Sequence, residues 1–114
     1  MEGCLFCSII EGKIPCEKVY EDEMVLAFKD INPEAPIHVL IIPKKHINSI
    51  NDLEDKHENL IGHIYTVCKK IAAELGIAES GYRVVTNCGA NAGQTVYHIH
   101  FHLLGGRNLN WPPG

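Results

Sequence analysis

Apolar residues recur along this chain at two different spacings, and the change of spacing predicts where helices and strands lie. Between residues 53 and 75 the apolar side chains are three, four or seven positions apart, which is the spacing of one helix face. Asn51 or Asp52 can cap the start of this helix, and Gly76 can end it. A shorter apolar stretch at residues 4–11, closed by Gly12, predicts a short N-terminal helix.

The other apolar segments are short, and turn-forming residues separate them. They predict strands at residues 18–20, 24–29, 37–42, 82–87 and 97–104. Residues 37–42 are apolar apart from His38, which is typical of a central strand buried on both faces. The whole chain, residues 1–114, therefore predicts a single α+β domain in which one long helix covers an antiparallel sheet.

The last predicted strand contains three histidines that alternate with apolar residues. Side chains of a strand point to opposite faces in turn, so His98, His100 and His102 are expected in one row. The other face is expected to lie on the core and to carry Tyr97, Ile99, Phe101 and Leu103. Such a row favours a metal site or an array for acid–base and nucleophilic chemistry, because imidazole titrates near neutral pH and binds metals. The alternative is an edge strand whose polar face is simply solvated.

Composition narrows the class of protein. With 46% hydrophobic and 21% charged residues the chain is typical of a soluble globular domain. The formal net charge of -4 argues against binding to a nucleic acid polymer. No apolar stretch approaches the ~20 residues that span a bilayer, and the N-terminus does not resemble a signal peptide. Five cysteines cannot all pair, so we expect a reducing, cytoplasmic location.

Cys4 and Cys7 form a Cys-x-x-Cys pair. This spacing provides half of a tetrahedral zinc site, and His46 with one histidine of the row would complete it. A redox pair of the thioredoxin type is an alternative, but the expected βαβ context is absent. Two unrelated cysteines on one helix face are also possible. We favour a structural zinc.

Two further features adjoin the histidine row. The loop before it contains Gly89, Gly93, Gln94 and Thr95, whose backbone N–H groups and hydroxyl suit a phosphate. The alternative is a glycine-bearing hairpin turn, but the three neighbouring histidines favour the phosphate site. His38 is either a core histidine with an ordinary partner or a residue that orients an imidazole of the row. The long helix also contains two histidines that we expect to be solvated, His57 and His63.

The histidine motif and several other segments resemble the histidine triad (HIT) family, in particular its nucleotide-binding branch, called Hint. The similar segments are His98–Leu104, Phe28–Ile31, Ala35–His38, Ile42–His46, Gly93–Tyr97 and the terminal Trp111–Gly114. The resemblance implies a five-stranded antiparallel sheet with one long helix and a short N-terminal helix, and a homodimer with a continuous sheet. It also implies hydrolysis of purine nucleoside 5′-phosphoramidates to a nucleoside monophosphate and an amine, through a nucleotidyl-histidine.

The resemblance assigns roles to particular residues. The nucleophile matches His100, the outer histidines match His98 and His102, and the histidine of the central strand matches His38. Asp30 matches the residue that binds the ribose, while Asn87 and Thr95 match the phosphate side. The remaining substrate-binding positions are apolar walls, the glycine-bearing loop and the C-terminal tail: Phe6, Ile9, Phe28, Ile31, Leu40, Gly93, Gln94, Val96 and Trp111.

The Cys4/Cys7 pair resembles the zinc ligands of some bacterial members, in which histidines matching His46 and His98 complete the site. With zinc bound, His98 cannot act as a free proton relay. The chemistry itself requires no cofactor. Other readings of the chain are a dinucleoside polyphosphate hydrolase, a nucleotide-binding regulatory or scaffold protein with incidental turnover, and a zinc-binding structural module. The Trp-Pro-Pro-Gly tail argues against the first, because it resembles the Hint element that reaches the partner protomer's site.

Overall fold

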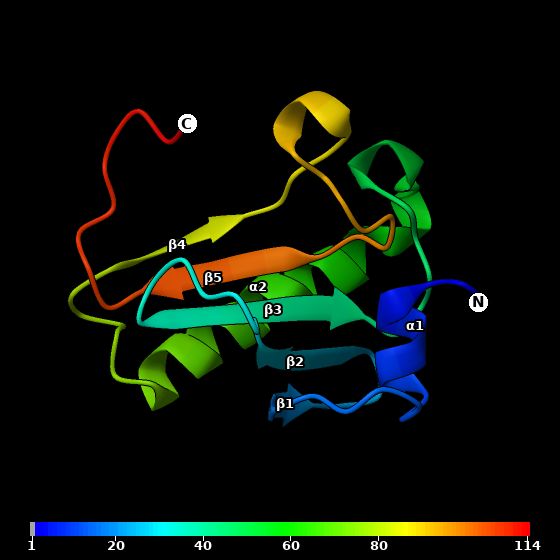
Figure 1. Ribbon diagram of the computed structural model, residues 1–114, viewed down its shortest axis with the longest axis horizontal. Helices are drawn as coiled ribbons and strands as arrows, with labels where there is room; N and C mark the ends of the chain where they lie inside the picture. The colour runs from blue at the N-terminus through cyan, green and yellow to red at the C-terminus, as the bar shows by residue number, and fades with distance from the viewer. Residues whose placement is uncertain (1) are drawn as a thin grey trace.

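A computed structural model describes residues 2–114 (Figure 1). The elements run in the order α1 (Leu5–Ile10), β1 (Lys18–Glu21), β2 (Val25–Lys29), β3 (Ile37–Pro43), α2 (Glu58–Glu74), β4 (Tyr82–Val85) and β5 (Phe101–Gly105). Single turns of 3-10 helix at Ile50–Asp52, Asp55–His57 and Ala90–Ala92 lie between them. None of the helices between residues 2 and 114 is both long and apolar enough to cross a membrane.

The strands form one five-stranded sheet in the order β1-β2-β3-β5-β4, and all neighbours are antiparallel. The predicted fold class is therefore confirmed. The central position of β3 is confirmed as well, since every residue of this strand except Ile37 is buried. Because β3 pairs with β5, His38 lies opposite Leu104, close to the histidines.

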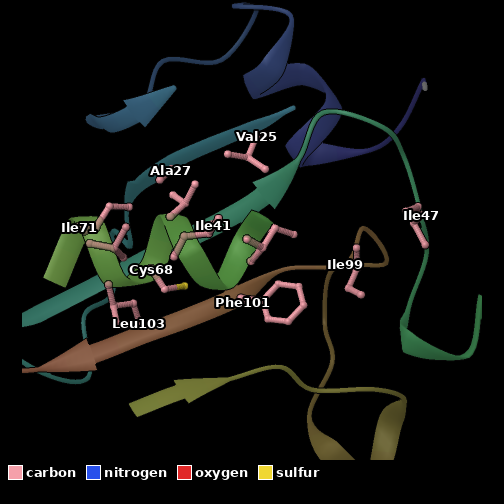
Figure 2. Packing of buried hydrophobic residues seen from close by; sticks show 12 residues of the cluster. Val25, Ala27, Ile41, Ile47, Cys68, Ile71, Ile99, Phe101 and Leu103 are labelled. Carbon is pink, nitrogen blue, oxygen red and sulfur yellow. The ribbon is translucent and has the colours of Figure 1, made fainter. Parts of the chain in front are cut away.

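The two faces of the sheet carry different clusters. Helix α2 crosses one face and packs Cys68 and Ile71 against Ile41, Phe101 and Leu103 (Figure 2). Each fully buried side chain of this size contributes about 1.5–3 kcal/mol. The alternate strand residues point to the other face, where Leu26, Phe28, Leu40 and Ile42 meet the short helix α1. The alternation thus separates the core under α2 from the face that carries the histidines.

The long helix is shorter than predicted and begins at Glu58 instead of residue 53. The chain first makes two 3-10 turns, in which the Glu54 N–H donates to His57 Nδ1 at 2.9 Å. This contact turns His57 inward, where it is buried. His63 is also less exposed than expected, because its ring binds Asp22 at 2.6 Å. The expectation that both histidines are solvated was wrong.

The histidine strand is also shorter than predicted, since pairing begins only at Phe101. Before it, the Ile99 N–H donates to Ile47 O at 2.7 Å, so this segment pairs with the loop after β3 instead of with a strand. The side chains still alternate, because Ile99, Phe101 and Leu103 all enter the core under α2. Tyr97 does not, and its side chain is 49% exposed. Strand β4 likewise ends at Val85, before the predicted residue 87.

Candidate active site and metal centre

A cavity of about 470 Å³ opens on the sheet face that carries α1. Its volume lies within the range of small-ligand pockets. One side is apolar, because Phe6 and Ile9 of α1 meet Phe28 of β2 and Leu40 of β3. The other side is polar. The cavity can therefore pack a flat ring against its apolar side and hydrogen-bond a charged group on its polar side. The predicted site residues that line it are His38, His100, His102, Phe6, Ile9, Phe28, Asp30, Ile31, Leu40, Thr95 and Val96.

His100 is held in one orientation at the floor of the cavity. Its Nδ1 donates to the carbonyl oxygen of His98 at 2.8 Å, which leaves Nε2 without a proton. The ring of Phe6 packs edge-on against it, with ring centres 5.0 Å apart. Burial lowers the pKa of His100, so the ring is neutral near pH 7. A neutral imidazole with a fixed free nitrogen is a nucleophile.

His38 and His102 form a hydrogen-bonded pair whose proton positions follow from the neighbours. The Glu34 N–H donates to His38 Nδ1 at 3.0 Å, so a neutral His38 carries its proton on Nε2. That nitrogen lies 2.9 Å from His102 Nδ1, which must accept. His102 therefore holds its own proton on Nε2, ready to donate to a ligand in the cavity. Burial, followed by the charges of His100 and His38, lowers the pKa of His102 to about 4.

Asp30 begins the loop that connects β2 to β3. Its Oδ1 accepts from the Asn32 N–H at 2.8 Å, and its Oδ2 lies 3.4 Å from His38 Nε2. Asp30 therefore caps the start of the loop and also lines the cavity. Asp30, His38 and His102 also lie close enough for a metal ion. The Glu34 N–H opposes one, because a metal on His38 Nε2 would force the ring proton onto Nδ1, against another donor.

The second cluster, unlike the first, is suited to a metal ion. Its donor atoms, from Cys4, Cys7, His46 and His98, all lie within 4.8 Å of one another. Cys4 Sγ lies 3.5 Å from His98 Nδ1, and Cys7 Sγ lies 3.3 Å from His46 Nδ1 and 3.6 Å from His98 Nδ1. The two Nδ1 atoms are 3.2 Å apart. Tetrahedral zinc, with bonds of about 2.3 Å to sulfur and about 2.0 Å to nitrogen, separates neighbouring ligand atoms by about 3.3–3.8 Å. The distances fit.

The outer nitrogens of this cluster support the same assignment. His98 Nε2 lies 2.8 Å from the Pro43 carbonyl, and His46 Nε2 lies 2.7 Å from Asn48 Oδ1. Both contacts place the ring proton on Nε2 and leave Nδ1 free to bind a metal. The His98 ring is fully buried, and burial lowers its pKa, which also favours the neutral ligand form. The Cys₂His₂ set therefore suits a structural zinc ion.

Four predicted substrate residues lie outside this cavity within the described chain. Gln94 is buried and holds the glycine-bearing loop, since its side chain accepts from the Gly89 N–H and donates to the Asn48 and Val96 carbonyls. The other three are Asn87, Gly93 and Trp111. Trp111 is 80% exposed, and Ile31 reaches the cavity rim with 92% of its surface exposed.

Part of the cavity wall carries no signal in the sequence. Residues 14–16 between α1 and β1 form one side, and Glu34 contributes from the loop before β3. No periodicity marks residues 14–16, because they are neither helix nor strand. Glu34 acts through its backbone N–H, for which no residue type is diagnostic.

Comparisons with known proteins agree with this geometry. A family model described as "Scavenger mRNA decapping enzyme C-term binding" matches residues 3–109. The crystal structure of a HIT family hydrolase from Legionella pneumophila Philadelphia 1 is 54% identical, with a TM-score of 0.97 over 98% of this chain and 100% of that one. The chain belongs to the histidine triad (HIT) family. The resemblance seen in the sequence is confirmed.

Two further HIT relatives carry functional names. A protein of Escherichia coli K12 named purine nucleoside phosphoramidase is 51% identical over 108 residues, which are 95% of this chain and 91% of the relative. A 14 kDa zinc-binding protein of Zea mays is 52% identical over 112 residues, which are 96% of this chain and 87% of the relative. At the level these similarities support, the chain is a HIT-family hydrolase.

Proposed function

We propose that this HIT protein hydrolyses purine nucleoside 5′-phosphoramidates to the nucleoside monophosphate and an amine. One observation carries the proposal: His100 presents an unprotonated Nε2 in the cavity, while its Nδ1 is fixed on the His98 carbonyl. The name of the E. coli relative supports the substrate class. The apolar wall around Phe6 and Phe28, 5.7 Å apart between ring centres, suits a purine, and Asp30 can accept from ribose hydroxyls.

The reaction has two displacement steps. His100 Nε2 attacks the phosphorus, the phosphorus–nitrogen bond breaks, and a nucleotidyl-histidine forms. The leaving amine takes a proton, which the hydroxyl of Thr95 can relay at the cavity wall. His98 is unsuited to this relay, because its Nδ1 faces the metal cluster. Water then attacks the phosphorus and releases the monophosphate and free His100.

The Nε2–H of His102 stabilises charge on the phosphoryl oxygens in both steps. Transfer of a phosphoryl group depends mainly on positioning and on such fixed donors. Zinc, when bound by Cys4, Cys7, His46 and His98, supplies structural cross-linking and takes no part in the displacement. The homodimer implied by the resemblance belongs to the same proposal. Strand β4 forms an edge of the sheet, and the exposed Trp111 lies in the tail beyond it.

The direct test is AMP release from adenosine 5′-phosphoramidate. The wild type is expected to release AMP, whereas His100→Gln, which keeps a polar side chain of similar size, loses turnover and still binds AMP in a titration. His63→Gln is the matched control, because His63 lies on helix α2 across the sheet and should leave AMP release unchanged. Folded wild-type protein that binds AMP without turnover would instead establish the scaffold function. Turnover confined to dinucleoside polyphosphates would establish the other hydrolase.

A further inference from the structure

The loop of residues 30–36 controls the histidine pair through one backbone donor. Pro33 and Pro36 have no N–H, so the loop has few donors of its own to fix its shape. Its Glu34 N–H donates to His38 Nδ1 at 3.0 Å and thereby decides which nitrogen of His38 carries the proton. Whatever orients the peptide groups around Glu34 therefore also sets the proton on His102.

Arg107, which follows β5, holds this part of the loop from outside. Its Nε and Nη2 both donate to the Glu34 carbonyl, at 3.1 and 2.9 Å. Its Nη1 donates to the Asn108 carbonyl at 2.9 Å, so the guanidinium is itself anchored. A planar guanidinium donates from several nitrogens in a fixed fork, and charge strengthens these bonds.

The backbone beside Arg107 touches the same loop. A Cβ added at Gly106 would lie 2.9 Å from Pro36 Cβ, so glycine permits the close approach. Its φ of +89° is also a conformation that side chains other than glycine disfavour. Figure 1 shows the loop before β3 beside the segment that leaves β5. Together, residues 106 and 107 clamp the loop against the end of the sheet.

We propose that Arg107 is a positioning residue for the hydrolase: it holds Glu34 so that His38 and His102 keep the tautomers that present His102 Nε2–H to the phosphoryl group. The proposal rests on the proposed function. The order of contacts is Arg107 to the Glu34 carbonyl, the Glu34 N–H to His38, and His38 to His102. Arg107 itself lies outside the cavity lining of the described residues.

The size of the expected effect follows from the alternative tautomer. If the loop moves, His38 can hold its proton on Nδ1, and its Nε2 then accepts a hydrogen bond from the Nδ1–H of His102. His102 would face the phosphoryl group with a lone pair instead of a donor. Asp30 Oδ2, 3.4 Å from His38 Nε2, still favours the original form, so the change is partial. We expect kcat to fall about three- to tenfold in Arg107→Gln, which is the effect of losing one hydrogen bond of ordinary strength.

The test reads the tautomers directly from side-chain nitrogen-15 NMR of the zinc-loaded, full-length protein. In the wild type, Nε2 of His38 and His102 should be protonated. In Arg107→Gln both rings should show averaged shifts, while AMP affinity changes less than about twofold because the apolar wall is untouched. Arg107→Lys, a single charged donor without the fork, should give an intermediate result. Arg107→Lys also provides the test if Arg107→Gln folds poorly.

Arg83→Gln is the matched control. Arg83 also donates to backbone carbonyls of the C-terminal segment, those of Leu109 at 3.4 Å and Asn110 at 3.0 Å. Neither carbonyl belongs to the loop of residues 30–36. The histidine nitrogen shifts of Arg83→Gln should equal those of the wild type. Unchanged shifts in both Arg107 variants would overturn the proposal, and so would averaged shifts in Arg83→Gln as large as those in Arg107→Gln. If Arg107→Gln gives averaged shifts but the wild type cleaves no phosphoramidate, the proposed reaction is refuted, while the hydrogen-bonded chain from Arg107 to His102 still holds.

Discussion

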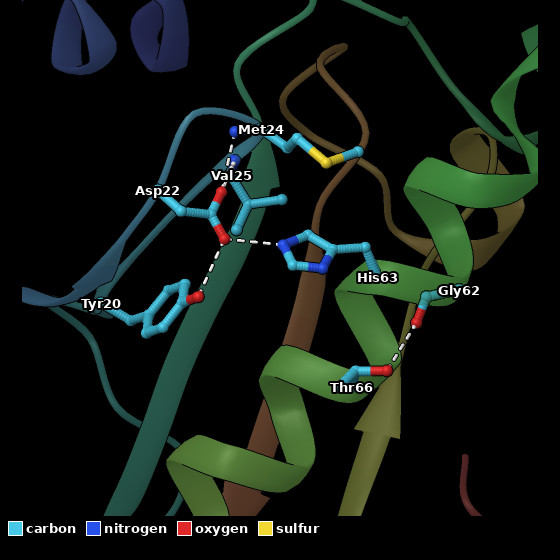
Figure 3. Close-up of polar contacts among 7 residues, drawn as sticks. All are labelled: Tyr20, Asp22, Met24, Val25, Gly62, His63 and Thr66. Atoms are coloured by element: carbon cyan, nitrogen blue, oxygen red, sulfur yellow. Dashed lines mark hydrogen bonds and ion pairs between the residues drawn. The ribbon is translucent and has the colours of Figure 1, made fainter.

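Asp22 joins the turn between β1 and β2 to helix α2, and removing its carboxylate tests how strongly that junction stabilises the fold. Its Oδ1 accepts from the N–H groups of Met24 and Val25 at 2.7 and 2.9 Å, and its Oδ2 accepts from the Tyr20 hydroxyl at 2.8 Å (Figure 3). The same Oδ2 lies 2.6 Å from His63 Nε2. One side chain therefore connects two strands and a helix.

The magnitude follows from what each partner loses in Asp22→Ala. Val25 is fully buried, so its N–H would remain without a partner, at a cost of about 1–3 kcal/mol. Tyr20 and His63 are only partly buried and can bind water instead, which adds little. We expect a loss of about 2–3 kcal/mol for Asp22→Ala. Asp22→Asn keeps the Oδ1 acceptor and loses only the charge, so we expect about 1 kcal/mol.

The pH dependence of this contribution has a definite sign. Burial alone would raise the pKa of Asp22, but hydrogen bonds from His63, Met24, Val25 and Tyr20 outweigh it and hold the pKa well below its usual range. A lowered folded-state pKa stabilises the fold fully above the unfolded value, roughly 3.9, and this is lost as the pH falls further. The difference between wild type and Asp22→Ala should be constant from about pH 5 to 7 and shrink below about pH 4.

Urea unfolding followed by circular dichroism measures both quantities. Release of zinc in acid affects wild type and variant alike, so the difference between them isolates Asp22. Glu23→Ala removes an exposed carboxylate from the same turn and should leave the free energy of unfolding nearly unchanged. A loss below about 0.5 kcal/mol at pH 7, or one that persists undiminished at pH 3, would refute the reasoning.

Two further predictions concern the metal and the core. Cys7→Ser should purify without stoichiometric zinc and melt at a lower temperature, because it removes one ligand of the set; atomic absorption and calorimetry measure this, and full zinc content would contradict it. Leu103→Ala, at a fully buried position under α2, should lower the free energy of unfolding by about 2–5 kcal/mol in urea titrations. A loss no larger than that of an exposed leucine, measured with Leu5→Ala, would contradict it.

The sequence predicted which way side chains face better than it predicted hydrogen-bond pairing. Ile99 was correctly placed in the core, although its N–H pairs with a loop and not with a strand. Facing depends on the local alternation of residues, whereas pairing depends on a neighbour that is distant in sequence. The prediction for His57 failed for a different, local reason: the 3-10 turn Asp55–His57 buries a residue whose type suggests exposure.

The candidate site divides in the same way. Residue type and spacing predicted Cys4, Cys7 and His46 as candidate metal ligands, whereas the choice of His98 came from the resemblance. Residue type allowed a contact between His38 and the histidine row, but it left an ordinary core histidine open and did not single out His102. The apolar wall was expected from the resemblance. The hold of Arg107 on Glu34 had no signal, since a side chain bound to a backbone carbonyl 73 residues away leaves no pattern in the sequence. Backbone-mediated parts of a site require the folded geometry.

His98 serves two networks through two different parts of one residue. Its ring faces the other candidate metal ligands, while its carbonyl oxygen fixes the ring of His100, the proposed nucleophile. A carbonyl is present whatever side chain the position carries. Substitutions at this position can therefore remove or restore the metal ligand while the carbonyl that orients His100 remains, provided that the backbone keeps its path. Metal binding and the proposed chemistry are thus free to evolve at different rates, although both would use the same residue.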